Sequence, residues 1–151
     1  MSGFKGPGLY TITASYVDKR LDLDDGKKED GTKLQLFKPL DDDKYGPDQQ
    51  FIIANVGRDE HVIINIKSGT YLTASDDNGQ ITANFISPLE NKVRWKIHPA
   101  RGAEGAYTIN SVAYNGKVVD VSGSKTDDRT PVLTYPSGGS KNQQFILNRV
   151  L

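Results

Sequence analysis

The fold is decided by a short stretch near the end of the chain, Gln143–Leu147, which reads QQFIL. Two related stretches precede it: Gln49–Ile53 reads QQFII, and Val93–Ile97 reads VRWKI. Each places one aromatic residue within two positions of an aliphatic residue, a pattern typical of a short strand with a buried ring. The three aromatic residues are 44 and 50 positions apart, so the spacing predicts three sequence repeats.

Working outward, each repeat also contains three shorter β-like runs separated by turns rich in Gly, Asp and Pro. In chain order these runs are Leu9–Ile12, Arg20–Leu23, Lys33–Phe37, His61–Ile64, Thr70–Thr73, Gln80–Asn84, Ala106–Ile109, Val118–Val121 and Pro131–Tyr135. No stretch keeps a helical period, and one unit of four short strands cannot bury an apolar face alone.

We therefore expect an all-β fold in which three four-stranded repeats close around a pseudo-threefold axis, a β-trefoil. A single domain is expected over residues 1–151, with repeats at approximately 8–56, 57–102 and 103–151. The expected core consists of one strand-opening Ile and one terminal aromatic from each repeat: Ile12, Phe51, Ile64, Trp95, Ile109 and Phe145.

The composition excludes several classes of function. Nineteen basic side chains balance nineteen acidic ones, and no basic stripe stands out, so we expect no nucleic-acid partner. No apolar stretch is long enough for membrane insertion. The chain has no cysteine and no apolar leader, from which we expect a cytoplasmic location.

The sequence also lacks the motifs of an enzyme or a metal site. There is no Gly-rich phosphate loop, nucleophile elbow or catalytic carboxylate pair. His61 and His98 are 37 positions apart and show no metal-ligand spacing. The Asp clusters occur in turns and do not match a calcium-binding loop. We expect a non-catalytic protein that needs no metal and no other cofactor.

The third repeat carries a set of residues suited to a sugar. Asp120 lies 15 positions before Tyr135, and Asn142 and Gln143 follow after a Gly-rich loop. An aromatic ring provides a flat face for stacking, a carboxylate accepts hydrogen bonds from hydroxyls, and an amide both donates and accepts. These four residues predict a shallow carbohydrate-binding pocket.

The first repeat carries a similar set. Asp22 again lies 15 positions before an aromatic residue, Phe37, and Gln35 is expected to face the same pocket. Here Asp48 and Gln49 stand where the third repeat has Asn and Gln, and an ionised Asp cannot donate a hydrogen bond. The connecting loop 38–47 is longer than its counterpart, so we expect a weaker or differently selective site.

The second repeat is expected to be structural only, because Leu72 is assigned to the position that Asp22 and Asp120 occupy in the other two.

The Gln-x-aromatic endings at Gln49–Phe51 and Gln143–Phe145 resemble those of the ricin-B-type β-trefoil lectins, while the middle copy keeps only its aromatic residue. The resemblance covers essentially the whole chain and is greatest to small single-domain fungal agglutinins, on the segments Gly3–Gly6 and Ile63–Ile66. It implies binding of galactose or N-acetylgalactosamine without metal, and a homodimer.

A second hypothesis is a β-trefoil protease inhibitor that acts through one exposed loop, for which 38–47, 58–60 or 101–105 are candidates. An inhibitor has no need of the Asp, aromatic and Asn-Gln set, which favours the lectin.

Overall fold

The structure, a computed structural model, describes residues 4–151. Residues 1–3 of the expected domain, including Gly3 of the segment Gly3–Gly6, lie outside the described residues. Over residues 4–151 the chain forms twelve strands and five single-turn 3-10 helices. None of these helices is long and apolar enough to cross a membrane. The strands are β1 (Gly8–Ala14), β2 (Arg20–Leu23), β3 (Thr32–Phe37), β4 (Phe51–Asn55), β5 (His61–Asn65), β6 (Tyr71–Thr73), β7 (Thr82–Asn84), β8 (Trp95–Pro99), β9 (Tyr107–Ser111), β10 (Lys117–Val121), β11 (Val132–Pro136) and β12 (Phe145–Arg149). The 3-10 helices are η1 (Asp24–Gly26), η2 (Gly46–Gln49), η3 (Asn91–Val93), η4 (Ser122–Ser124) and η5 (Lys141–Gln143).

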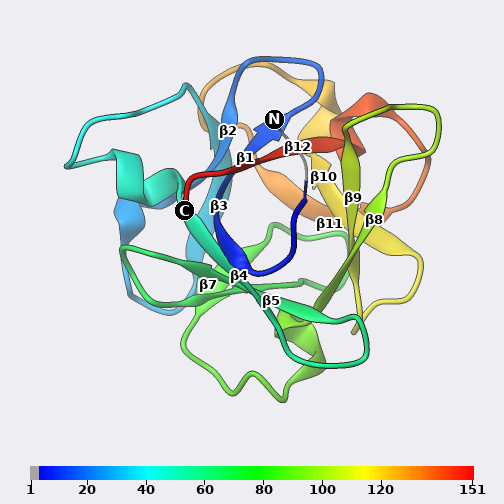
Figure 1. Cartoon of the computed structure of the whole chain (residues 1–151), viewed down its shortest axis with the longest axis horizontal. Coiled ribbons are helices and arrows are strands. Elements are labelled where there is room, and N and C mark those ends of the chain that lie inside the picture. Colours follow the sequence, from blue (N-terminus) through cyan, green and yellow to red (C-terminus); the bar gives the residue numbers. More distant parts are fainter. Residues whose placement is uncertain (1–3) are drawn as a thin grey trace.

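Six of the strands form a closed barrel. They pair antiparallel in the cyclic order β1, β4, β5, β8, β9 and β12, and β12 returns to β1. The other six strands form three hairpins, β2–β3, β6–β7 and β10–β11, which lie together at one end of the barrel. Figure 1 shows the three repeats as three lobes around a central axis. This is the predicted β-trefoil, and each predicted run overlaps one of the strands.

Strand register defines which residues are equivalent in the three repeats. Phe51 pairs with Tyr10, Trp95 with His61, and Phe145 with Tyr107. Counting two residues onward from Tyr10, His61 and Tyr107 gives Ile12, Ile63 and Ile109, each at most 1% exposed.

The prediction is therefore wrong for one of the six expected core residues. Ile64 is only half-buried, and its neighbour Ile63 fills the core position in the second repeat. Successive side chains of a strand point to opposite faces, so an alignment error of one residue selects the wrong face.

An aromatic plug fixes the N-terminal segment. The ring of Phe4 lies against the side chains at all three equivalent positions, with centroid distances of 5.7 Å to Tyr10, 5.2 Å to His61 and 6.3 Å to Tyr107. The hydroxyl of Tyr10 donates to the carbonyl of Gly6 at 2.6 Å. Burial lowers the pKa of His61, which favours the neutral imidazole beside these rings. One ring thus ties the first described residues to strands of all three repeats.

We predict that Phe4→Ala lowers the free energy of unfolding by about 2 kcal/mol, less than the loss for a fully buried Phe because Phe4 is half-buried. Chemical denaturation measures this difference. Phe85→Ala is the matched control, since Phe85 is 76% exposed and its truncation should change the free energy by less than about 0.5 kcal/mol. Equal losses in the two variants would rule out a plug.

Candidate functional site

The third repeat forms a hollow of about 520 Å³ at the outer side of its hairpin. Asp120 lies on β10 opposite Leu133 of β11, and Tyr135 follows two residues later on β11. The turn of η5 brings Asn142 and Gln143 to the same hollow. All four residues predicted for this pocket therefore line one cavity, together with Gly138 of the Gly-rich loop. The other lining residues were not singled out from the sequence: Ser122, Gly123, Ser124, Leu133, Pro136 and Ser140.

Gln143 holds the carboxylate of Asp120 in place. Its amide nitrogen donates to Asp120 Oδ2 at 2.8 Å and to the carbonyl of Pro136 at 2.9 Å, while its oxygen accepts from the N–H of Gly138 at 2.8 Å. These bonds use both amide hydrogens of Gln143, so its role here is to fix Asp120 and the loop. Asp120 still has acceptor sites for a ligand, because a carboxylate offers about four lone-pair positions.

Burial raises the pKa of Asp120, and the amides of Gln143 and Asn142 oppose that rise. Asn142 donates to the carbonyl of Val121 at 3.0 Å and accepts from the hydroxyl of Ser140 at 2.6 Å, and its amide also interacts with the carboxylate of Asp120. The ring of Tyr135 is 43% exposed. The pocket thus combines a buried anionic acceptor, an amide and an open aromatic face.

The first repeat repeats this scheme in a smaller hollow of about 350 Å³. Gln49 donates to Asp22 Oδ2 at 2.9 Å and to the carbonyl of Lys38 at 2.8 Å, and it accepts from the N–H of Leu40 at 2.9 Å. Gln35, which lies opposite Asp22 where the third repeat has Leu133, donates to Asp22 Oδ1 at 3.1 Å. Both oxygens of Asp22 are therefore held by amides of the protein.

The carboxyl group of Asp22 has an unusual protonation equilibrium. Burial raises the pKa of Asp22 from 3.8 to about 6, and the nearby carboxylates of Asp48 and Asp24 add to the rise. The amides of Gln49 and Gln35 oppose it. Near neutral pH the ionised form predominates, whereas mild acid protonates it.

Asp48, the counterpart of Asn142, has its carboxylate occupied by the protein itself. Lys67, from the turn after β5, places its Nζ 3.1 Å from Asp48 Oδ1, and Asp48 is 3% exposed. Burial raises the pKa of Asp48, and the ammonium of Lys67 opposes the rise. Asp48 lines the pocket as predicted, but its charge is paired with Lys67.

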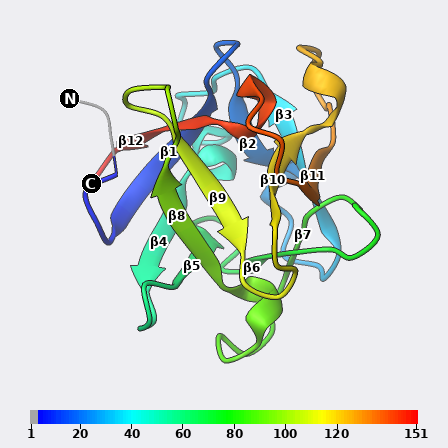
Figure 2. The ribbon, with the colours of Figure 1, turned by 90° about the vertical axis from the view of Figure 1, so that its right-hand side faces the viewer.

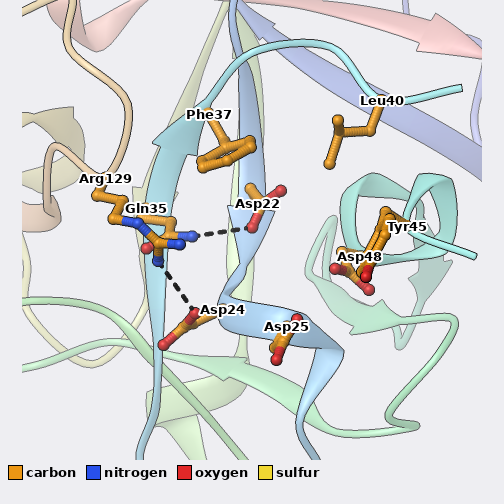
Figure 3. A pocket seen from close by; sticks show the side chains of 9 residues that line it. All are labelled: Asp22, Asp24, Asp25, Gln35, Phe37, Leu40, Tyr45, Asp48 and Arg129. Atoms are coloured by element: carbon orange, nitrogen blue, oxygen red, sulfur yellow. Dashed lines mark hydrogen bonds and ion pairs between the residues drawn. The ribbon is translucent and has the colours of Figure 1, made fainter.

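Five side chains of this pocket were not assigned to it from the sequence: Asp24, Asp25, Leu40, Tyr45 and Arg129. Leu40 and Tyr45 come from the long loop, which folds over the pocket as one of its walls, and Arg129 reaches in from the third repeat (Figure 3). An aromatic residue in an unusually long loop was a signal that could have identified Tyr45. No local spacing could have identified Arg129, because its turn is 92 positions beyond Phe37 in the sequence.

The second repeat has no comparable set of side chains. The strand pair Tyr71–Asn84 of the second repeat is equivalent to Arg20–Phe37 in the first repeat and to Val118–Tyr135 in the third. This register places Thr73, and not Leu72, at the position of Asp22 and Asp120, so that assignment was wrong by one residue. The second repeat still lacks a carboxylate and an aromatic ring at these two positions, because Thr73 has no charge and Asn84 replaces the aromatic residue. Asn84 Nδ2 donates to Thr73 Oγ1 at 2.9 Å, which pairs the two side chains with each other.

Comparison with known proteins identifies the family of the chain. Residues 47–135 and 91–150 match the family described as ricin-type β-trefoil lectin domain-like. The chain belongs to this family. An agglutinin from Sclerotinia sclerotiorum is 32% identical over an alignment of 151 positions, which covers 95% of this chain and 96% of the relative.

Solved structures show the same fold. The Rhizoctonia solani agglutinin aligns with a TM-score of 0.80 at 24% identity, covering 97% of both chains. The Macrolepiota procera ricin B-like lectin, in complex with lactose, aligns with a TM-score of 0.75 at 24% identity, covering 97% of this chain and 98% of that one.

We predict that Asp22 titrates near pH 6 in the folded protein, as measured by NMR of its carboxyl carbon. Asp128 is the internal reference, since its bond to Lys19 lowers its pKa below 3.8. Because folding raises the pKa of Asp22, its protonation stabilises the fold fully below about pH 4, and this stabilisation is lost as the pH rises through 6. The amount is about 3 kcal/mol, and Asp22→Asn should remove this component of the pH dependence. An ordinary pKa for Asp22 would show that the site is not desolvated.

Proposed function

We propose that this protein is a non-catalytic lectin that binds glycans containing galactose or N-acetylgalactosamine. The third-repeat pocket is its main site, and the first-repeat pocket is a second one. The observation that carries the proposal is the buried carboxylate of Asp120, fixed by Gln143 beside the exposed ring of Tyr135.

This arrangement suits a pyranose with an axial hydroxyl at C4. Such a sugar has several C–H groups on one face, which pack on an aromatic ring. In the proposed pose the C4 hydroxyl and its neighbour at C3 both donate to Asp120, and a charged acceptor makes these bonds about twice as strong as neutral ones. An equatorial C4 hydroxyl, as in glucose or mannose, leaves that acceptor poorly paired.

Family membership and a relative that bears the name agglutinin support a carbohydrate-binding function, and the Macrolepiota lectin provides a lactose complex on the same fold. Homodimer formation is part of the proposal. Shallow sites bind weakly, and a dimer raises avidity by linking them.

The structure gives less support to a protease inhibitor. Residues 38–47 form a wall of the first pocket, and their backbone is held by Gln49. The candidate loop 58–60 ends in Glu60, whose Oε1 accepts from Arg94 Nε at 2.6 Å in a buried ion pair. Two of the three candidate loops are thus bound to the body of the protein.

We predict that Asp120→Asn abolishes lactose binding at the third pocket. The substitution keeps the shape of the side chain and the bond from Gln143 but removes the charge, at a cost of about 1–3 kcal/mol. Because a millimolar site has only about 4 kcal/mol in total, calorimetry should show one site fewer. Asp59→Asn, on an exposed turn, is the control and should bind as the unmodified protein does. Unchanged affinity and stoichiometry in the Asp120 variant would refute this site.

We also predict that lactose competes for the third pocket at least tenfold better than mannose, because one unpaired partner in a desolvated site costs more than a small change in apolar contact. Competition against an immobilised galactoside measures the ratio. Equal competition by the two sugars would show that Asp120 does not read the C4 hydroxyl.

A further inference from the structure

Arg129 occupies a backbone position that long side chains rarely take. It lies in the turn before β11 with a φ of +72°. The residues at the equivalent positions of the first and second repeats, Gly31 and Asn78, also have positive φ, at +89° and +57°. Gly and Asn tolerate this left-handed conformation far better than Arg does. The turn therefore carries strain at Arg129 that Gly31 and Asn78 largely avoid at the equivalent positions.

The side chain of Arg129 crosses from the third repeat into the first pocket. Its guanidinium carbon is 5.5 Å from the centroid of the Phe37 ring, within the range of a cation–π contact. Its NH1 donates to Asp24 Oδ1 at 3.5 Å. Both Arg129 and Asp22 line the hollow that the Phe37 ring faces (Figure 3). The guanidinium therefore takes up ring surface inside the pocket.

The aromatic ring of the third pocket has no cation over it among residues 4–151. None of the cation–π contacts in this part of the chain involves Tyr135, the counterpart of Phe37. For the third pocket, the residue equivalent to Arg129 comes from the second repeat and is the shorter Asn78. Ser122 stands at the position of Asp24, the residue that bonds the guanidinium in the first pocket. Ring, carboxylate and Gln are thus shared by the two pockets, whereas the cation over the ring is specific to the first.

We propose that Arg129 determines the affinity of the first pocket. Its guanidinium occupies the face of Phe37 on which a neutral pyranose would stack, so a galactoside must displace it before it can bind. This inference rests on the proposed function of the pocket. The displaced contacts are individually weak, because the side chain of Arg129 is 65% exposed and its bond to Asp24 is long. Together they reduce affinity about fivefold.

The test isolates the first pocket by disabling the third. In the Asp120→Asn background, lactose binding is measured by calorimetry with and without Arg129→Asn. Asn is the residue that the second repeat has at this position, and it tolerates the positive φ. We expect lactose to bind the double variant about fivefold more tightly than Asp120→Asn alone.

Two further variants separate this effect from others. Asp24→Asn, in the same background, releases the guanidinium without altering the turn of Arg129, and we expect affinity to rise about twofold. Arg58→Asn is the matched control, because Arg58 is exposed, has a φ of +57° and lines neither pocket. It removes the same charge and relieves similar strain, and we expect no change.

Lactose affinity that stays unchanged, falls or remains undetectable in the double variant would overturn the role of Arg129, and so would an equal rise with Arg58→Asn. None of these outcomes bears on the third pocket. The proposed function itself fails on a different result, the absence of galactoside binding by the protein with Asp120 and Arg129 both intact.

Discussion

Closure of the barrel depends on three opposed pairs of side chains, one in each repeat, formed by Phe51, Trp95 and Phe145 with their partners on the opening strands. These three large rings are fully buried. Gln49 and Gln143 each precede such a ring by two residues, so burial of the ring also brings the amide against the Asp of the neighbouring hairpin. The burial of these rings therefore determines both the packing of the core and the position of the Gln amide in each of the two pockets.

Much of this could be predicted from the sequence, because repeats with alternating apolar residues and Gly- or Asp-rich turns encode strands locally. The second repeat was read one residue out of register at Ile64 and Leu72, since its ending lacks the Gln and its strand β6 has only three residues. Lys67 and Arg129 reach the first pocket from other repeats. Such contacts depend on how the repeats pack against each other, and the spacing of residues within one repeat carries no information about that packing.

The two pockets show how one frame can support different environments. In the third, Asp120 faces Leu133 and keeps free acceptor capacity, whereas in the first Asp22 is bonded by two amides and lies among other carboxylates. The substitution of Leu by Gln at one position of the hairpin accounts for part of this difference. The long loop that carries Tyr45 forms a wall of the first hollow, which is the smaller of the two, at about 350 Å³ against 520 Å³. The two repeats thus share the framework of the pocket and differ in its walls.

The threefold arrangement of the repeats also has a geometric consequence. The two pockets belong to the first and third repeats, which form different lobes around the central axis (Figure 1). If both pockets bind glycans as proposed, the two glycans held by one copy of the chain attach to different lobes. A single copy then has two separate points of attachment, which is what a protein needs to join two glycan-bearing surfaces.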